Sequence, residues 1–273
     1  MQVVEAQGAR IPIVGFGTMR LKEDAGTQAI LSAIKTGYRH LDTAAFYGNE
    51  REVGEAMRAS GVAREDFFLT TKVRDNNLKA DDFARSIDNS LKLLDLPSVD
   101  LLLIHWPNAN VPMAESIGAL NKAKRDGLAR HIGVANYTVA LMDEATRATK
   151  EPLVTNQIEV HPFLDQTRVI AAARSHGMSI TAYCPIARGR VPGNPVLERI
   201  GAAHRKTAPQ VSLRWLVQQG IIVIPGSGTP ARQKENFDVL DFSLTPAEMT
   251  EIAGLKRPDS RVVNPPQAPK WDL

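Results

Sequence analysis

Four polar side chains stand at or just beyond the ends of apolar runs, and together they could protonate a carbonyl oxygen. Asp42, Lys72 and His105 each end such a run, and Tyr47 lies in the loop after Asp42. Tyrosine, with an ordinary pKa of about 10, is a weak acid at neutral pH. A nearby ammonium lowers the pKa of a phenol, and an aspartate can hold that ammonium in place. With a histidine to donate a hydrogen bond to the carbonyl oxygen, the set predicts general acid catalysis.

Each of these residues alone has an ordinary structural explanation. Asp42 could cap a turn, Tyr47 could pack in a loop, and His105 could be a core histidine with satisfied hydrogen bonds. Lys72 is harder to explain, because it follows the apolar run Phe67–Leu69 and a buried ammonium is costly without a carboxylate partner. The sequence therefore predicts an ion pair between Lys72 and Asp42 on neighbouring strands.

The elements that position these residues alternate along the chain. Short apolar runs rich in β-branched residues predict eight strands, at Val14–Gly17, Tyr38–Asp42, Phe67–Lys72, Val99–Ile104, His131–Ala135, Val154–Glu159, Ser179–Tyr183 and Ile221–Pro225. The segments between them have a helical period, as where Phe83, Ile87, Leu91 and Leu94 share one helix face. Glycines stand where several of these helices should end, at Gly37, Gly61, Gly127, Gly177 and Gly220.

Eight strand–helix repeats predict an α/β fold, a closed (β/α)8 TIM barrel that forms a single domain over residues 1–273. Before the barrel, Val3–Glu5 and Ile11–Val14 predict an N-terminal β-hairpin. The alternative fold is an open doubly wound sheet. That fold would need a Gly-x-Gly-x-x-Gly turn after its first strand, and Gly15–Arg20 lacks the third glycine.

The later part of the chain predicts additions to the barrel. Two helices, Pro195–His204 and Ala208–Gln219, fall between the last two strands, so one of them is an extra helix. A further helix begins at Thr245, with Glu248 placed to complete a capping box. Several prolines follow Arg257, and we expect an irregular C-terminal arm that lies over the barrel.

The composition excludes several classes of protein. Hydrophobic residues make up 43% of the 273 residues and charged residues 23%, which is ordinary for a globular protein and excludes disorder. The single Cys184 excludes an internal disulfide and a cysteine-cluster metal site, and with no His-x-x-x-His pair we expect no metal. A net charge of +3 without a basic stripe argues against nucleic-acid binding but suits an anionic cofactor or substrate. Neither a signal peptide nor a membrane span is predicted, so we expect a cytoplasmic protein.

The motifs around the four residues resemble those of the aldo-keto reductases. These motifs are Asp42–Glu50, Leu69–Lys72, Leu102–Pro107, Gly133–Asn136, Asn156–Glu159, Ala182–Tyr183, Ile224–Pro225, Arg232 and Glu235–Asn236. They follow the order of the family and span nearly the whole chain. Within the family, the short loops and the tail Arg261–Asp272 are most similar to the bacterial 2,5-diketo-D-gluconate reductases, especially the B type.

The resemblance implies a barrel that reduces an aldehyde or ketone to an alcohol with NADPH. Tyr47 is implied to be the proton donor, Lys72 to lower its pKa, Asp42 to hold Lys72, and His105 to orient the carbonyl. The residues implied to contact NADPH or NADP⁺ are Thr18, Asn136, Gln157, Tyr183, Cys184, Arg188, Arg190, Ser227, Arg232, Glu235 and Asn236. Among these, Tyr183 is implied to stack on the nicotinamide and Arg232 to face the 2′-phosphate.

Two departures from the family pattern bear on the cofactor. Gly226 stands where many members have a lysine, so one usual partner of the 2′-phosphate is missing and the preference for NADPH should be weaker. Ala135 stands where many have a serine, which removes one possible hydrogen bond to the carboxamide of the nicotinamide.

For the substrate, the resemblance implies a small α-dicarbonyl or keto-sugar acid, such as 2,5-diketo-D-gluconate or methylglyoxal. The residues expected around it are Phe46, Tyr47, His105, Trp106 and Trp271, although these aromatic residues could equally belong to the core. Two other functions stay open, a cofactor-sensing regulatory subunit with slow turnover and a Schiff-base lyase acting through Lys72. We expect a monomer.

Overall fold

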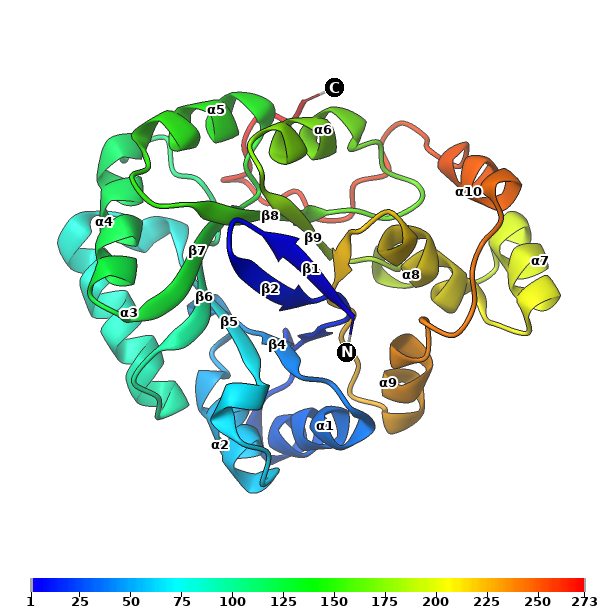
Figure 1. The fold of residues 1–273 in the computed structure, drawn as a ribbon, viewed down its shortest axis with the longest axis horizontal. Coiled ribbons are helices and arrows are strands. Elements are labelled where there is room, and N and C mark those ends of the chain that lie inside the picture. Colours follow the sequence, from blue (N-terminus) through cyan, green and yellow to red (C-terminus); the bar gives the residue numbers. More distant parts are fainter. Residues whose placement is uncertain (1, 273) are drawn as a thin grey trace.

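The computed structural model describes residues 2–272, and its centre is a barrel of eight parallel strands (Figure 1). The strands are β3 (Phe16–Gly17), β4 (His40–Asp42), β5 (Phe68–Val73), β6 (Val99–Ile104), β7 (Ala129–Ala135), β8 (Leu153–Glu159), β9 (Ser179–Tyr183) and β10 (Ile222–Val223). Each strand pairs with the next one along the chain. The first and last strands then meet, because the amides of Gly15 and Gly17 donate to the carbonyls of Val223 and Pro225 at 2.8 and 3.2 Å. The predicted TIM barrel is confirmed, and the doubly wound alternative is wrong.

The closure between β3 and β10 depends on glycines. A Cβ atom at Gly17 would lie 2.7 Å from the carbonyl oxygen of Ile224, and one at Gly226 would lie 2.4 Å from the carbonyl oxygen of Gly17. Both contacts are with backbone atoms, which cannot move aside as a flexible side chain can. The glycine at position 226 is therefore required by the packing of the two segments as they are placed here.

The interior of the barrel is filled by alternate side chains of its strands. In β6, Leu101 and Leu103 point inward, whereas Leu102 and Ile104 pack against the surrounding helices. The hairpin of β1 (Val3–Ala6) and β2 (Ala9–Pro12) crosses one end of the barrel, in the foreground of Figure 1. Its Ile11 is fully buried and packs with the inward-pointing side chains. The hairpin thus closes that end, and the carboxyl ends of the strands lie at the other.

Helices surround the strands (Figure 1). They are α1 (Glu23–Thr36), α2 (Glu50–Ala59), α3 (Ala80–Leu94), α4 (Met113–Arg125), α5 (Val139–Ala148), α6 (Thr167–Ser175), α7 (Pro195–His204), α8 (Ala208–Gln218), α9 (Pro230–Phe237) and α10 (Pro246–Ala253). Short 3-10 helices are η1 (Ala45–Tyr47), η2 (Arg64–Asp66), η3 (Asp75–Asn77) and η4 (Ala187–Gly189). The extra helix is α7, which packs against α8 and α10 outside the ring. The capping box at Thr245 is present, and all five predicted helix-ending glycines have a positive φ.

Some element bounds differ from the sequence prediction. The predicted strand from Tyr38 begins at His40, because the Tyr38 amide still donates to the carbonyl of Ala33 in the preceding helix turn. The strands β3 and β10 are shorter than predicted. The residues next to them close the barrel through single backbone hydrogen bonds rather than through a continuous strand pairing. The arm after Arg257 contains no helix or strand, as expected, and passes near α5 and α6 (Figure 1).

Candidate active site

The carboxyl ends of neighbouring strands bring Asp42, Tyr47 and Lys72 together. The Lys72 Nζ lies 2.6 Å from Oδ1 of Asp42, and it also donates to the Thr43 carbonyl at 2.8 Å and to the Tyr47 hydroxyl at 3.3 Å. Lys72 and Asp42 are each only 1% exposed. The predicted ion pair is confirmed, and it holds the ammonium directly beside the phenol.

The net pKa of Tyr47 differs from the sequence expectation. We expected the ammonium of Lys72 to lower it below 10. Burial, the largest influence, raises the pKa of Tyr47 above its ordinary value, and the charge of Lys72 only partly opposes this. Asp42 contacts the same ammonium and offsets part of its charge. Tyr47 therefore keeps its proton at neutral pH in this site, as a proton donor must.

The ammonium itself remains charged. Burial lowers the pKa of Lys72, but the neighbouring Asp42 carboxylate and Tyr47 raise it by more, so that the net pKa lies above the ordinary value. A buried cation of this kind is stable only while its carboxylate is present.

His105 lies beside the phenol as a neutral imidazole. Its ring centroid is 5.6 Å from that of Tyr47, and the two planes meet at 82°. Burial, together with the positive charges of Lys72 and Arg74, holds the pKa of His105 well below 6.5. A neutral imidazole with one N–H can donate a hydrogen bond to a carbonyl oxygen without delivering a proton of its own.

A second layer of hydrogen bonds fixes Asp42. Gln157 at the end of β8 donates from Nε2 to Oδ2 of Asp42 at 2.7 Å, and the Thr18 hydroxyl donates to the Asp42 carbonyl at 3.0 Å. Both were predicted as cofactor contacts, and sequence reasoning missed these bonds to Asp42. Only the closure of the barrel brings positions 18, 42 and 157 to one point. The Oε1 of Gln157 has no hydrogen-bond partner within residues 2–272 and is free to accept one.

Asn136 and Tyr183 are linked to each other at the same end of the barrel. Asn136, in the left-handed region with φ of 63°, donates from Nδ2 to the His105 carbonyl at 2.9 Å. It accepts a hydrogen bond from the Tyr183 hydroxyl on Oδ1 at 2.7 Å. The phenol of Tyr183 is buried, which raises its pKa well above 10. The ring of Tyr183 is thus held in place by its own hydroxyl, as a stacking surface requires.

Other predicted cofactor residues follow β10. Asn236 is 5% exposed, yet its side chain makes no hydrogen bond within residues 2–272. Arg232 is exposed and has no ion-pair partner in the same range. The Ser227 hydroxyl accepts from the Thr229 amide at 3.0 Å, and one Glu235 oxygen accepts from the Thr207 hydroxyl. A buried amide without a partner and an unpaired arginine fit a ligand that is both polar and anionic.

The loop after β9 carries the remaining predicted contacts. Its backbone is left-handed at Cys184, Ala187 and Arg188, with φ of 49°, 49° and 51°. Burial, and next the charge of Glu159, raise the pKa of the Cys184 thiol, although the nearby Arg188 opposes them. Arg188 and Arg190 are exposed and form no ion pair in the described part of the chain. The thiol is therefore not activated; Arg188 contacts it, whereas Arg190 is exposed to solvent.

Two tryptophans, Trp106 next to His105 in the sequence and Trp271 in the C-terminal arm, pack together as an aromatic wall. Trp106 packs edge-on against Trp271 of the C-terminal arm, with 6.0 Å between ring centroids. Phe46 is 55% exposed and lies 6.1 Å from the His105 ring, which places it at the rim. In contrast, Trp215 is a core residue of α8. Of the predicted substrate-facing aromatic residues, Phe46 and Tyr47 therefore pack beside His105, and Trp106 and Trp271 pack against each other.

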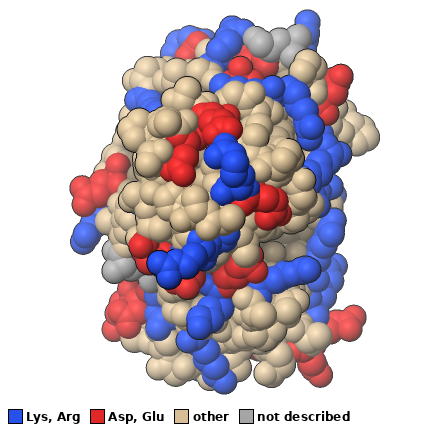
Figure 2. Space-filling view, turned by 90° about the vertical axis from the view of Figure 1, so that its right-hand side faces the viewer, with Lys and Arg blue, Asp and Glu red and all other residues tan. Residues whose placement is uncertain are grey.

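Basic residues line one edge of this end of the molecule. In Figure 2, Lys and Arg side chains form a nearly continuous column along the right-hand edge, which is the end of the barrel away from the hairpin. Such an edge attracts anions toward the mouth of the barrel.

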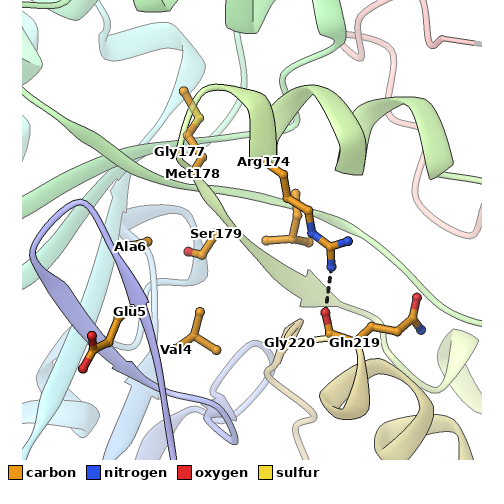
Figure 3. Close-up of a pocket in the computed structure, with 10 residues that line it drawn as sticks. Val4, Glu5, Ala6, Arg174, Gly177, Met178, Ser179, Gln219 and Gly220 are labelled. Atoms are coloured by element: carbon orange, nitrogen blue, oxygen red, sulfur yellow. Dashed lines mark hydrogen bonds between the residues drawn. The ribbon is translucent and has the colours of Figure 1, made fainter.

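A separate hollow lies at the opposite end (Figure 3). It has a volume of about 370 Å³ and lies between the hairpin residues Val4–Ala6, the start of β9 and Gly220. There Arg174 donates to the carbonyl of Gln219 at 2.7 Å. Since it lies at the amino ends of the strands, it is not the place where a barrel of this kind carries its chemistry.

Within residues 2–272, no group of three or more His, Cys, Asp or Glu side chains could hold a metal ion. In the same range, no helix is both long enough and apolar enough to cross a membrane.

Comparison with known proteins points to one family. The model of the Aldo/keto reductase family matches residues 13–257. The methylglyoxal reductase DkgB of Escherichia coli O157:H7 is 40% identical over 265 residues, which cover 96% of this chain and 99% of that protein. A solved structure described as a candidate 2,5-diketo-D-gluconic acid reductase B is 50% identical, with a TM-score of 0.98 over 100% of this chain and 98% of that one. An aldo-keto reductase of Bombyx mori in complex with NADP is 33% identical, with a TM-score of 0.87 over 97% of this chain and 94% of the other.

Proposed function

Because the chain belongs to the aldo/keto reductase family of NAD(P)H-dependent oxidoreductases, we propose that it uses NADPH to reduce small α-dicarbonyl or keto-sugar-acid substrates to alcohols. The observation that carries this proposal is the Lys72 ammonium, held 2.6 Å from Asp42 and 3.3 Å from the Tyr47 hydroxyl, next to a neutral His105. This arrangement supports proton donation to an oxygen on which negative charge develops.

Each group has a distinct part in the reaction. NADPH, when bound, would supply a hydride to the carbonyl carbon. Tyr47 gives its proton to the carbonyl oxygen, and the Lys72 ammonium stabilises the phenolate that remains. His105 donates a hydrogen bond to the same oxygen and sets its direction. Asp42 keeps the ammonium in place and charged.

The polar groups at the carboxyl ends of the strands are suited to hold the cofactor. Gln157, through its free Oε1, and Asn136 would bind the carboxamide, and Tyr183 would stack on the nicotinamide ring. At the other end of the cofactor, the unpaired Arg232 would bind the 2′-phosphate and the buried Asn236 the adenine. The other residues that we place along the cofactor are Thr18, Cys184, Arg188, Arg190, Ser227 and Glu235.

The choice of substrate draws on the names of the relatives. One is named for methylglyoxal and another for 2,5-diketo-D-gluconic acid, and both compounds are small and carry more than one carbonyl group. The basic edge in Figure 2 favours the anionic compound.

The test is a panel of aldehydes, α-dicarbonyls and keto-sugar acids, assayed with NADPH and NADH in parallel. We expect turnover with NADPH at ordinary enzymatic rates, of about 1–10³ s⁻¹. Turnover far below this range for every carbonyl in the panel would favour the regulatory-subunit alternative. Borohydride trapping tests the lyase alternative, which the geometry disfavours because a charged, buried Lys72 is a poor nucleophile.

A further inference from the structure

The C-terminal arm is fixed across the mouth of the barrel at two points. The amides of Val262 and Val263 donate to the two oxygens of Glu159, at 2.7 and 2.8 Å, and Glu159 is fully buried at the end of β8. Further along, the Asp272 carboxylate accepts from the Val139 amide at the start of α5, at 2.9 Å. Both anchors follow carboxyl ends of barrel strands, so the arm between them lies at the same end as the catalytic residues.

Arg261 directly precedes the first anchor and lies beside the aromatic wall. Its guanidinium carbon is 3.7 Å from the centroid of the Trp271 ring, whose indole N–H donates to Asn264 at 2.8 Å. Trp271 in turn packs against Trp106, the residue after His105. The short anchors and the stacked ring therefore hold this cation in a defined place, where its charge acts on Tyr183 at the carboxyl end of β9.

Arg261 has no ion-pair partner in the described part of the chain, and the charge of the nearby Glu159 acts on it only from beyond ion-pair distance. Within residues 2–272, no carboxylate lies within ion-pair distance of its guanidinium, and its buried Nη1 atom has no hydrogen-bond acceptor. The nearby Glu159 carboxylate is already occupied, because it accepts from the two arm amides and contacts His161 at 3.0 Å. An unpaired cation in such surroundings is costly, and other shielded cations of the chain have partners, as Lys72 has Asp42.

An arginine offers two parallel N–H donors, which match the two oxygens of a carboxylate. Arg261 is only partly buried, so a small anion that enters the mouth can approach it. We propose that Arg261 binds the carboxylate of the substrate and makes this chain selective for keto acids over neutral carbonyl compounds of the same size. The inference rests on the proposed reductase function and names the substrate class of the same site.

Two substrates that differ only in one terminal group, which is charged in one and neutral in the other, provide the test. One is 2,5-diketo-D-gluconate, and the other is 5-keto-D-fructose, in which a CH₂OH group replaces the carboxylate. A hydrogen bond to a charged group corresponds to a factor of about 10–150 in affinity, so Arg261→Met should raise KM for the acid by that factor. The KM for the neutral compound and the kcat for both should stay near those of the wild type.

Matched variants separate charge from structure. Arg257, which is exposed and lies over the ring of Phe163 on the same arm, provides the control, and Arg257→Met should change neither substrate. Arg261→Lys keeps the charge but loses the paired donors, so its KM for the acid should fall between those of the wild type and Arg261→Met. A KM increase that is equal for both substrates, or none for the acid, would overturn the inference.

A binding measurement distinguishes this failure from a failure of the proposed function. D-gluconate, which carries the carboxylate but no carbonyl, is titrated into the NADP⁺-loaded protein while tryptophan fluorescence is recorded. We expect saturable binding that Arg261→Met weakens and Arg257→Met does not. If neither carbonyl compound is reduced, the reductase proposal fails, whereas this titration still decides the role of Arg261. Binding of gluconate unchanged in Arg261→Met would refute it.

Discussion

Replacing Lys72 with methionine removes the ammonium and leaves the Asp42 carboxylate buried without its cation. The pair is 2.6 Å apart and both residues are 1% exposed, so no water can take over the role of the ammonium. Breaking a buried ion pair by removing one partner costs about 3–5 kcal/mol. At about 2–4 °C per kcal/mol for a protein near this size, the melting temperature should fall by roughly 6–20 °C.

A second substitution tests whether the loss arises from the unpaired charge. Changing Asp42→Asn together with Lys72→Met removes both charges and keeps an acceptor for Gln157. Urea unfolding followed by circular dichroism should find much of the lost free energy of unfolding restored in the double variant. If the double variant is as unstable as Lys72→Met alone, the destabilisation has another cause and the reasoning is refuted.

The pH dependence of the same free energy follows from the raised pKa of Lys72. Because the folded pKa is raised, the stabilisation is fully present below the ordinary lysine pKa of about 10.4 and is lost as the pH rises through the folded value. The difference in unfolding free energy between the wild type and Lys72→Met should thus be constant near neutral pH and shrink only in strong alkali. A difference that already shrinks as the pH rises from neutral toward the ordinary lysine pKa would contradict the assigned charge.

Three further predictions concern the cofactor and the histidine. Gly226→Lys should lower the melting temperature and fail to strengthen NADPH binding, because its Cβ would clash with the Gly17 carbonyl oxygen. Thermal melting and cofactor titration measure the two effects. Tighter NADPH binding without destabilisation would contradict this prediction. Arg232→Ala should remove an NADPH-over-NADH preference of about 10–150-fold in kcat/KM by weakening NADPH alone, and an unchanged ratio would place the 2′-phosphate elsewhere. Because the pKa of His105 lies well below 6.5, kcat/KM for reduction should not fall as the pH is lowered through 6.5. A decrease of kcat/KM at that pH in the wild type, absent in His105→Gln, would show that His105 is protonated there and would contradict a neutral imidazole.

The sequence was sufficient to predict the barrel and the ion pair, for different reasons. The strands were found because buried parallel strands are short apolar runs, as Val99–Ile104 illustrates without any shift in its bounds. The pairing of Lys72 with Asp42 was predicted because a lysine in an apolar run has few other ways to remain charged. Both predictions depend on local composition and on one strong energetic constraint.

The contacts that the sequence did not reveal depend on how distant segments meet. The bond from Gln157 to Asp42 joins positions 115 residues apart, and no local pattern indicates it. The net pKa of Tyr47 was misjudged because the extent of burial is a property of the assembled site. Likewise, Glu159 binds the C-terminal arm, and Arg261 lacks an ion-pair partner. The sequence did not predict either feature, because the arm has no helix or strand whose pattern would indicate its contacts.

Whether Tyr47 donates the proton is decided by the variant Tyr47→Phe. The variant keeps the ring beside Lys72 and His105 but removes the hydroxyl that lies 3.3 Å from the ammonium. Single-turnover reduction by the NADPH-loaded protein measures the chemical step, and fluorescence titration measures cofactor binding. If Tyr47 is the donor, the rate of the chemical step should be lower by about 10²–10⁴-fold, with NADPH affinity unchanged. A variant that retains more than about a tenth of the wild-type rate for the chemical step would contradict the account, since general acid catalysis contributes far more than that factor.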